Sequence, residues 1–320
     1  MDGEEEDCSC SKPSSPPHEA LFLVLPYLPV CELLAISQVC LSLRDAVNKD
    51  VLPWLNLLVQ SPLSSHLSDD VLFKLSSRAN GGLKTLALMN CSKVTDSGLL
   101  RVVQENPFLN KLYIPSCTNI TPEGVLRAVK LLSQGSPSLS TIRINGIHNL
   151  NKQHLDTLTS YLKSNHQPLQ QPMYYHRRSN MSAFKHGEDE TPARTIDLEM
   201  CPKCLEPRMV YDCPRETCKM KKKKKKGETE MGEEWCRACH FCIPRCEDCG
   251  ICVGYGEMEE SACEDSLCGE CWLKLPKCNF CNKPYCKQHT DWWCRFSESR
   301  FICRVCNEEY LGYMPSNDVF

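Results

Sequence analysis

The feature that most constrains this chain is the density of cysteine in its C-terminal third. Of the 25 cysteines, 19 lie between Cys201 and Cys306, and most form pairs with C-x2-C spacing. Two thiolates at this spacing can wrap one tetrahedral metal ion, whereas disulfide frameworks belong to secreted chains. The total is odd, and the acidic N-terminus has neither the basic nor the apolar part of a secretory signal. We therefore expect reduced, zinc-binding cysteines in an intracellular chain of the nucleus, the cytoplasm or both.

The predicted zinc ligands are closely spaced cysteines and one histidine. They are Cys201, Cys204, Cys213, Cys218, Cys236, Cys239, Cys246, Cys249, Cys268, Cys271, Cys278, Cys281, Cys286, His289, Cys303 and Cys306. Cys242, Cys252, Cys263, Cys294 and His240 are further candidates, and together the 19 cysteines and two histidines suffice for five four-ligand ions at most. Because thiolates are abundant enough to close every site, the pattern predicts structural rather than catalytic zinc.

The pairing of these ligands stays open, because runs such as C-R-A-C-H-F-C offer overlapping choices. One arrangement of the last stretch is a cross-brace. In it, one ion is held by Cys268, Cys271, Cys286 and His289, and a second by Cys278, Cys281, Cys303 and Cys306. This arrangement resembles a PHD or RING finger, although the Cys-His order and the short first spacer depart from those patterns.

Three segments that begin at Leu83, Leu109 and Leu139 repeat one arrangement of apolar residues. The first two share the pattern L-x-x-L-x-[LI]-x-x-C-x-x-[VI]-T-x-x-G-[VL], with Cys91 and Cys117 in equivalent places 26 residues apart. A fixed period of this length is typical of repeats in which each unit supplies a short strand and a helix. The segments resemble leucine-rich repeats of the cysteine-containing type, and the predicted fold class is α/β.

Side chains alternate across a strand, so each repeat should send one set of residues inward and another outward. The predicted inward residues are Leu86, Leu88, Leu112, Ile114, Ile142 and Ile144. The opposite, concave face is the predicted target-binding surface, with Lys111, Tyr113, Thr141, Arg143 and Asn145. Cys91 and Cys117 are predicted to be buried small residues rather than ligands.

Apolar residues near the N-terminus recur at helical spacing. Leu21, Val24, Leu25 and Leu28 form one stripe, and Pro29 separates it from a second apolar stripe. Short helices in so few residues cannot bury all of this surface within themselves. The surplus apolar surface therefore indicates a partner.

The same segment resembles the F-box over residues 17–54. The matching residues are Pro17, Glu19, Leu21, Val24, Leu25, Tyr27, Leu28, Pro29, Glu32, Leu33, Leu34, Ser37, Val39, Cys40, Arg44 and Trp54. Pro16, Pro26 and Leu43 depart from the family pattern, and Pro26 can kink the first helix. The resemblance implies docking on a SKP-type adaptor, and through it on cullin. The docking residues that it implies are Pro17, Leu21, Val24, Leu25, Leu28 and Pro29.

The chain divides into five predicted regions. They are a disordered tail (1–16), the F-box (17–62), the leucine-rich repeats (63–165), a linker or long loop (166–192) and the irregular zinc-binding module (193–320). Residues 193–201 repeat the spacing of the strands, so the module could open with a further repeat strand. The longest apolar run falls short of the roughly 20 residues that span a membrane. A net charge of −3 gives no general attraction to nucleic acid.

The order of these regions resembles plant F-box proteins of the SKP-interacting-partner family. It implies a non-catalytic substrate receptor of a SKP–cullin–F-box (SCF) ubiquitin ligase, which binds a protein target of unknown identity. Two alternatives remain open: a RING-like zinc ligase, and a nuclear zinc protein that binds nucleic acid or histone tails. In the second case Lys219 and residues 221–226 would serve as a nuclear signal or a phosphate-binding strip.

Overall fold

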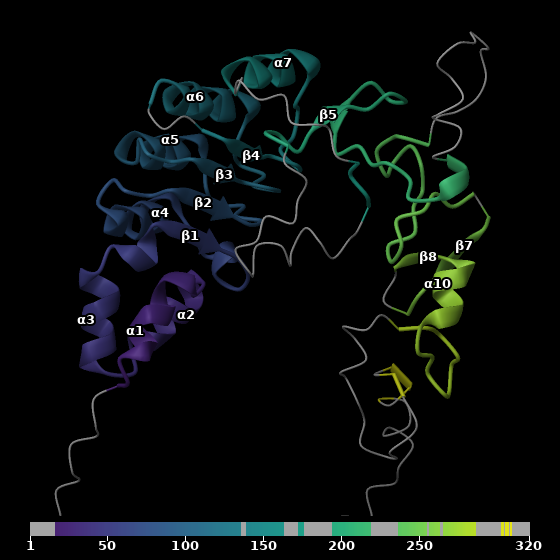
Figure 1. Ribbon diagram of the computed structural model, residues 1–320, viewed down its shortest axis with the longest axis horizontal. Helices are drawn as coiled ribbons and strands as arrows, with labels where there is room; N and C mark the ends of the chain where they lie inside the picture. Colours follow the sequence, from purple (N-terminus) through teal and green to yellow (C-terminus); the bar gives the residue numbers. More distant parts are fainter. Residues whose placement is uncertain are drawn as a thin grey trace, which may run out of the picture. The chain divides into compact units, whose positions relative to one another are not determined.

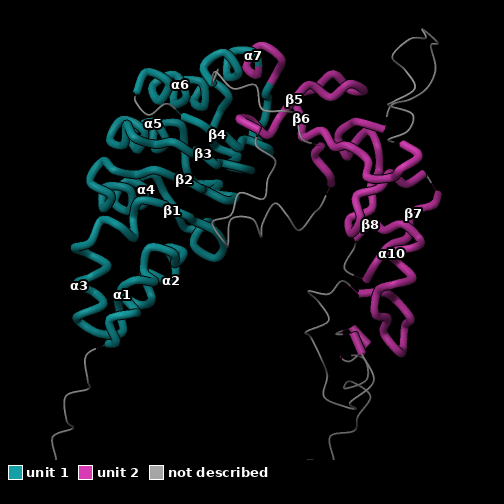
Figure 2. The backbone as a smooth tube through the Cα atoms, in the orientation of Figure 1, with its two compact units in different colours: residues 1–150, 156–163 teal, residues 151–155, 164–320 magenta. Residues whose placement is uncertain are grey.

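The computed structural model divides into two compact units (Figure 2). The first unit comprises residues 1–150 and 156–163, and the second comprises residues 151–155 and 164–320. The residues that the structure describes are 17–135, 139–162, 172–175, 194–218, 236–254, 256–262, 265–285, 302–303, 305–306 and 308. The predicted tail, the lysine run and most of the predicted linker lie outside them.

The first unit begins with short helices (Figure 1). They are α1 (Ala20–Val24), the 3-10 turn η1 (Leu25–Tyr27), α2 (Val30–Ile36), α3 (Leu41–Lys49) and the 3-10 turn η2 (Leu52–Trp54). Pro26 lies in η1, where the tighter turn replaces the α-helix because proline has no N–H to continue it. The ring of Trp54 is buried, and its Nε1–H donates to the Val47 carbonyl oxygen at 2.7 Å. The Arg78 guanidinium lies 4.5 Å over that ring, which ties the helices to the following repeats.

A parallel four-stranded sheet follows, in the order β1-β2-β3-β4 (Figure 1). The strands are β1 (Asn56–Val59), β2 (Thr85–Leu88), β3 (Lys111–Tyr113) and β4 (Thr141–Arg143). Helices follow them in turn as α4 (Asp69–Ser76), α5 (Asp96–Glu105), α6 (Pro122–Ser133) and α7 (Lys152–Tyr161), with the 3-10 turns η3 (Leu63–Ser65) and η4 (Ser77–Ala79) around α4. The six predicted inward residues are all buried, and so are Cys91 and Cys117. The mixture of helices and strands confirms the α/β prediction.

Strand β1 lies inside the segment predicted to be helical, so that prediction is wrong for Asn56–Val59. Leu57 and Val59 pair with Leu86 and Leu88 and are buried like them. The turn between this strand and the next helix is two residues longer than in the later repeats, so the repeat pattern does not match this segment. The sheet therefore has one strand more at its first edge than the three repeats predicted.

The end of the segment expected to open with a further repeat strand, residues 193–201, forms part of a hairpin. Strand β5 (Glu199–Met200) pairs antiparallel with β6 (Pro207–Arg208), so it forms a hairpin in the second unit. The cysteine pair that follows β5 turns the chain back on itself. The repeat strand predicted around Ile196 and Leu198 precedes this hairpin and stays a prediction.

Consecutive repeats are linked by an aspartate from one helix that caps the next. Asp69, the first residue of α4, accepts hydrogen bonds from the backbone N–H of Thr95 at 2.9 Å and from its hydroxyl at 2.6 Å. Asp96 in α5 does the same for the N–H of Thr121 at 2.8 Å and its hydroxyl at 2.6 Å. Each carboxylate thus satisfies a donor at the N-terminus of the following helix, where negative charge is also favoured.

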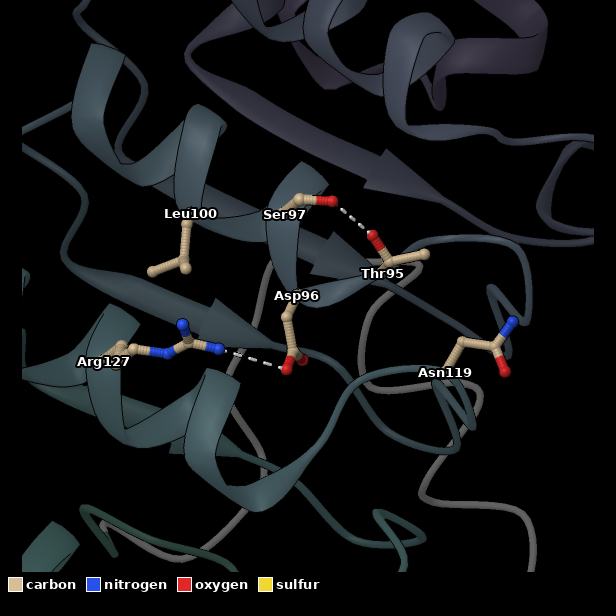
Figure 3. A pocket seen from close by; sticks show the side chains of 6 residues that line it. All are labelled: Thr95, Asp96, Ser97, Leu100, Asn119 and Arg127. Atoms are coloured by element: carbon tan, nitrogen blue, oxygen red, sulfur yellow. Dashed lines mark hydrogen bonds and ion pairs between the residues drawn. The ribbon is translucent and has the colours of Figure 1, made fainter.

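The glycine of the T-x-x-G pattern makes room for this carboxylate. A Cβ on Gly98 would overlap the carboxylate of Asp69, and a Cβ on Gly124 would overlap that of Asp96. Figure 3 shows Asp96 paired with Arg127 at the edge of a shallow hollow of about 350 Å³. This hollow is lined by Thr95, Asp96, Ser97, Leu100, Asn119 and Arg127.

The series ends at the third repeat, where α6 begins with Pro122 in place of an aspartate. There Asn151 and His154 bond each other instead. The His154 N–H donates to Asn151 Oδ1 at 3.0 Å, and the Asn151 N–H donates to His154 Nδ1 at 3.3 Å. His154 occupies the place of Gly98 and Gly124, in the repeat whose preceding helix begins with Pro122 rather than aspartate.

The second unit has little regular structure in its described residues. Beyond the β5-β6 hairpin it contains β7 (Met258–Glu260), β8 (Ser266–Cys268) and α10 (Gly269–Lys274) (Figure 1). Cysteines make up half of the residues in its two buried clusters, and aliphatic residues make up the other half. None of the described helices of either unit is long and apolar enough to cross a membrane.

Part of the predicted linker belongs to this second unit. Tyr174 bridges to Asp212, and the ring of Tyr175 meets that of Tyr211 edge-on at 5.0 Å. The Asp212 N–H also donates to the Met173 carbonyl oxygen at 2.6 Å. Residues 172–175 are therefore a packed piece of the second unit rather than a free connection.

Candidate functional site

Sixteen cysteines of the second unit form four clusters of four. The clusters are Cys201/Cys204/Cys239/Cys242 (cluster A), Cys213/Cys218/Cys236/Cys252 (cluster B), Cys246/Cys249/Cys268/Cys271 (cluster C) and Cys278/Cys281/Cys303/Cys306 (cluster D). Within each cluster all four sulfur atoms lie within 4.8 Å of one another. These sixteen cysteines are all free thiols, so none of them is in a disulfide.

The distances between sulfur atoms fit a tetrahedral ion. Cys201 and Cys242 Sγ lie 4.0 Å apart, Cys213 and Cys252 3.8 Å, and Cys249 and Cys268 3.8 Å. A metal–sulfur bond of about 2.3 Å gives a tetrahedron with edges of roughly 3.8 Å, whereas a disulfide would bring two sulfurs to about 2.05 Å. The four clusters can therefore each hold a metal ion without rearrangement of the thiols.

Three of the cysteine pairs share one backbone turn, which we call the knuckle. In the first, the Leu205 N–H donates to the Cys201 carbonyl oxygen at 2.9 Å, and the Cys201 N–H donates to the Glu206 carbonyl oxygen at 2.9 Å. The knuckles of clusters C and D repeat both bonds, at 2.8 to 3.0 Å. In all three the residue after the second cysteine has a positive φ. The turn itself therefore brings both thiols of the pair to one side.

Backbone N–H groups also point at the sulfurs from the other half of each cluster. The Cys239 N–H approaches Cys201 Sγ at 3.4 Å, the Cys252 N–H approaches Cys213 Sγ at 3.4 Å, and the Cys303 N–H approaches Cys278 Sγ at 3.3 Å. Such donors stabilise thiolates, which are the form that binds metal.

Electrostatics within the clusters favour some thiolates and oppose others. Burial raises the pKa of Cys201 and Cys278, but backbone hydrogen bonds outweigh it and lower these pKa values to about 6 and about 7. A hydrogen bond with Cys236 lowers the pKa of Cys213 to about 4. Burial raises the pKa of Cys249 to about 12. The protein alone thus favours only part of each thiolate set, and a bound cation would have to stabilise the rest.

A buried arginine supports clusters B and C. The Arg245 guanidinium donates to the carbonyl oxygens of Tyr211 at 2.8 Å and Asp212 at 3.3 Å. It also donates to the carbonyl oxygens of Cys236 in cluster B and Gly250 in the knuckle of cluster C. Sequence reasoning did not identify this role, because nothing in the local pattern distinguishes Arg245 from a surface arginine.

The predicted ligands and the clusters agree for most positions. Fourteen of the predicted cysteines lie in a cluster, namely Cys201, Cys204, Cys213, Cys218, Cys236, Cys239, Cys246, Cys249, Cys268, Cys271, Cys278, Cys281, Cys303 and Cys306. Two of the further candidates, Cys242 and Cys252, complete clusters A and B. His240 belongs to none of the four clusters. The predicted Cys286 and His289, with Cys263 and Cys294, lie outside the described residues.

The predicted cross-brace is wrong at its first site. Cys268 and Cys271 join Cys246 and Cys249 in cluster C, because β8 and α10 bring them beside that knuckle. The second set of the cross-brace, cluster D, is found as predicted.

The N-terminal helices carry an apolar surface in the free chain. Leu21, Leu23, Val24 and Tyr27 are exposed, Tyr27 at 84%. Leu25 is only 2% exposed, so it belongs to the core of the helices and its predicted place on the docking surface is wrong. The remaining predicted docking residues, Pro17, Leu28 and Pro29, are partly exposed. The exposed apolar side chains form the surplus surface that the sequence pattern predicted.

The predicted target-binding face is covered at its centre. Tyr113 is 3% exposed and Arg143 is 9% exposed, and the Arg143 guanidinium lies 5.7 Å from the Tyr113 ring centre. Lys111, Thr141 and Asn145 are partly exposed. The side chains of Tyr113 and Arg143 are therefore packed, and the target-binding role predicted for this face stays a prediction.

Comparison with known proteins places this arrangement in a family. Residues 197–280 match the family model described as the At3g27290 F-box protein C-terminal domain. The chain is 44% identical over 278 residues to F-box protein SKIP28 of Arabidopsis thaliana, covering 85% of this chain and 82% of that protein. It is 36% identical over 279 residues to F-box protein SKIP14 of the same plant, covering 86% of this chain and 58% of that protein. F-box protein At3g27290, also of Arabidopsis thaliana, is 35% identical over 239 residues, which cover 74% of this chain and 60% of its own length. This chain therefore belongs to the family of F-box proteins.

Proposed function

We propose that this F-box protein is the substrate receptor of a SKP–cullin–F-box ubiquitin ligase. The observation that carries the proposal is the set of apolar side chains left exposed on the first helices. In an F-box protein, a SKP-type adaptor would bury this apolar surface on binding, which explains why the surface is exposed in the free chain. The adaptor would in turn join the chain to cullin.

The docking surface that we propose centres on Leu21 and Val24, with Leu23 and Tyr27 beside them. Pro17, Leu28 and Pro29 form its partly exposed margin. Leu25 lies beneath this surface and holds the helices together. A side chain of this kind affects adaptor binding only through the fold.

The parallel sheet and its helices are interpreted as a leucine-rich-repeat array. The parallel strands in matching register, the stacked inward apolar residues and the Asp–Thr links between repeats support this interpretation. Lys111, Thr141 and Asn145 remain candidates for contact with a target, since they are partly exposed on the strands and at their ends.

The metal proposed for clusters A to D is zinc in a structural role. Four thiolates at tetrahedral spacing close each site and leave no open position for a substrate or a reactive water. Bound zinc would contribute roughly 10 kcal/mol or more per site to the folding of a unit that has few aliphatic core residues. The receptor itself would then perform no chemistry, and would act by raising the effective concentration of a target near the conjugating enzyme.

The test is a pull-down of a purified SKP-type adaptor with full-length variants. We expect wild type to bind, and Leu21→Asp with Val24→Asp to lose binding at least tenfold while the circular dichroism spectrum is retained. Leu131→Asp is the matched control, because Leu131 is an exposed leucine on α6, away from the proposed surface. The proposal fails if wild type does not bind, or if the double variant binds as tightly as the control.

A further inference from the structure

The knuckle of cluster A differs from its two counterparts at one position. The residue after the second cysteine is Leu205 with φ 60° in cluster A, Gly250 with φ 73° in cluster C and Asn282 with φ 56° in cluster D. Glycine adopts this left-handed conformation without steric cost, and asparagine adopts it more readily than other residues. Leucine is disfavoured there, so the turn itself gives no reason for its presence.

Burial does not explain Leu205 either. Its side chain is 71% exposed, although a leucine normally contributes to stability by leaving water. Among the described residues, the other non-glycine positions with positive φ are all asparagine or serine. A large apolar side chain that is both conformationally disfavoured and exposed points to a role outside the folded unit.

A second exposed apolar residue belongs to the same cluster. Phe241 lies between Cys239 and Cys242 and is 66% exposed. Its loop is joined to the knuckle through the cluster, where the Cys204 and Cys239 sulfurs lie 3.9 Å apart. Two apolar side chains are thus held on neighbouring loops whose backbones are fixed by the cysteines.

Basic groups accompany these side chains. The Arg208 guanidinium lies 4.6 Å from the Phe241 ring centre, and the His240 ring lies 3.9 Å from the same ring centre. Lys203 lies in the knuckle itself, and the acidic residue in the same turn is Glu206. We call Lys203, Leu205, Arg208, His240 and Phe241 the knuckle patch, with the exposed Leu205 and Phe241 as its apolar centre. Glu199 lies opposite Arg208 in the hairpin but is paired with Arg194 and Arg237, so basic side chains outnumber acidic ones around the patch.

We infer that the knuckle patch binds an acidic segment of a partner protein, whose apolar anchor residue packs on Leu205 and Phe241. Carboxylates beside that anchor would meet Arg208 and Lys203. This inference rests on the proposed function and extends it, because it names the class of target segment that the second unit binds. Charge complementarity selects an acidic rather than a basic segment, and the apolar centre selects a protein over a simple polyanion.

The experiment is selection of peptides from a display library of short random sequences on the zinc-loaded full-length chain. We expect enrichment of peptides in which Asp or Glu flanks a leucine, methionine or phenylalanine. Synthetic copies of the enriched peptides should bind wild type and lose at least tenfold in affinity to Leu205→Gly and to Phe241→Ser. Leu205→Gly reproduces the residue found in the knuckle of cluster C, so it should keep the fold and the zinc content. Leu205→Asn, which reproduces the residue in the knuckle of cluster D, provides a second variant in case the first alters the metal content.

Leu273→Asn is the matched control, since Leu273 is an exposed leucine of the same unit on α10. Its affinity for the peptides should equal that of wild type. The inference is overturned if selection yields no acidic consensus, if the patch variants bind as tightly as the control, or if the patch instead binds a single-stranded oligonucleotide in competition with the peptides. Adaptor pull-down with Leu205→Gly separates the two proposals, because the knuckle patch variant should retain the adaptor whatever happens to the peptides.

Discussion

Replacement of Gly124 by alanine tests whether the repeats are joined by their Asp–Thr links. In most helices this change stabilises, by up to about 1 kcal/mol, because alanine is the better helix former. Here the added Cβ would overlap the carboxylate of Asp96, which approaches from the preceding helix. The carboxylate would have to move away from Thr121.

The expected cost follows from the two bonds that would be lost. Asp96 accepts from the Thr121 N–H at 2.8 Å and from its hydroxyl at 2.6 Å. Hydrogen bonds to a charged group contribute about 1.5 to 3 kcal/mol each. The Asp96 side chain is partly exposed, at 20%, so the lower value is appropriate, and the two bonds together are worth about 3 kcal/mol. After the gain in helix propensity, we expect Gly124→Ala to destabilise the first unit by about 2 kcal/mol.

A double-mutant cycle with Asp96→Ala isolates this cause. Without the carboxylate, the alanine at position 124 has nothing to overlap and should be neutral or stabilising by up to about 1 kcal/mol. Urea unfolding followed by circular dichroism measures the free energies, and hydrogen exchange of peptides from residues 83–135 assigns them to the first unit. The reasoning is refuted if Gly124→Ala costs less than about 0.5 kcal/mol, or if the two changes are simply additive.

Three further substitutions test cluster B and Arg245 in the second unit and Trp54 in the first unit. Cys252→Ser should remove about one zinc ion per chain by native mass spectrometry, because it opens cluster B, whereas Cys117→Ser should leave the zinc content unchanged. Arg245→Met should speed hydrogen exchange across residues 236–254, since it leaves buried carbonyl oxygens without a donor; unchanged exchange would argue against a supporting role. Trp54→Phe should destabilise the first unit by about 1 to 2 kcal/mol in urea, because the bond to the Val47 carbonyl oxygen is lost, and no measurable cost would contradict this.

The repeats could be predicted from the sequence because the pattern of apolar residues indicates both the spacing of the strands and which side chains point inward. Leu86, Leu88, Leu112 and Ile114 alternate along strands whose equivalents recur 26 residues apart, and the structure buries all four. Strand β1 escaped prediction because its repeat has a longer turn and no cysteine at the equivalent place. The sequence pattern includes Gly98 but does not show why glycine is needed there, because Asp69, which approaches it, belongs to a different repeat.

The apolar stripe at the N-terminus misplaced Leu25 for a different reason. The assignment assumed one continuous α-helix, in which Leu21, Val24, Leu25 and Leu28 share a face. The α-helix ends at Val24, and Leu25 begins the 3-10 turn η1, which contacts η2 further along the chain. A stripe read from local spacing does not reveal that contact, and Leu25 faces the core while Leu21 and Val24 remain exposed.

The cysteine pairing resisted prediction because two of the runs are divided between clusters. In the run from Cys236 to Cys242, the first cysteine belongs to cluster B and the other two to cluster A. In the run from Cys246 to Cys252, the last cysteine belongs to cluster B and the others to cluster C. Spacing alone is identical within and between clusters, so only the fold decides which neighbour each cysteine joins.

This division has a mechanical consequence for the second unit. Cluster B takes one cysteine from each run, so a metal ion in it would fix the ends of the loops that form clusters A and C. Arg245 lies between those runs and donates to carbonyl oxygens in both, which couples them a second time. Cluster D shares no such run with the others. The three coupled clusters form a continuous support on which the knuckle of cluster A, and with it Leu205, is held in a conformation that an unsupported loop would not keep.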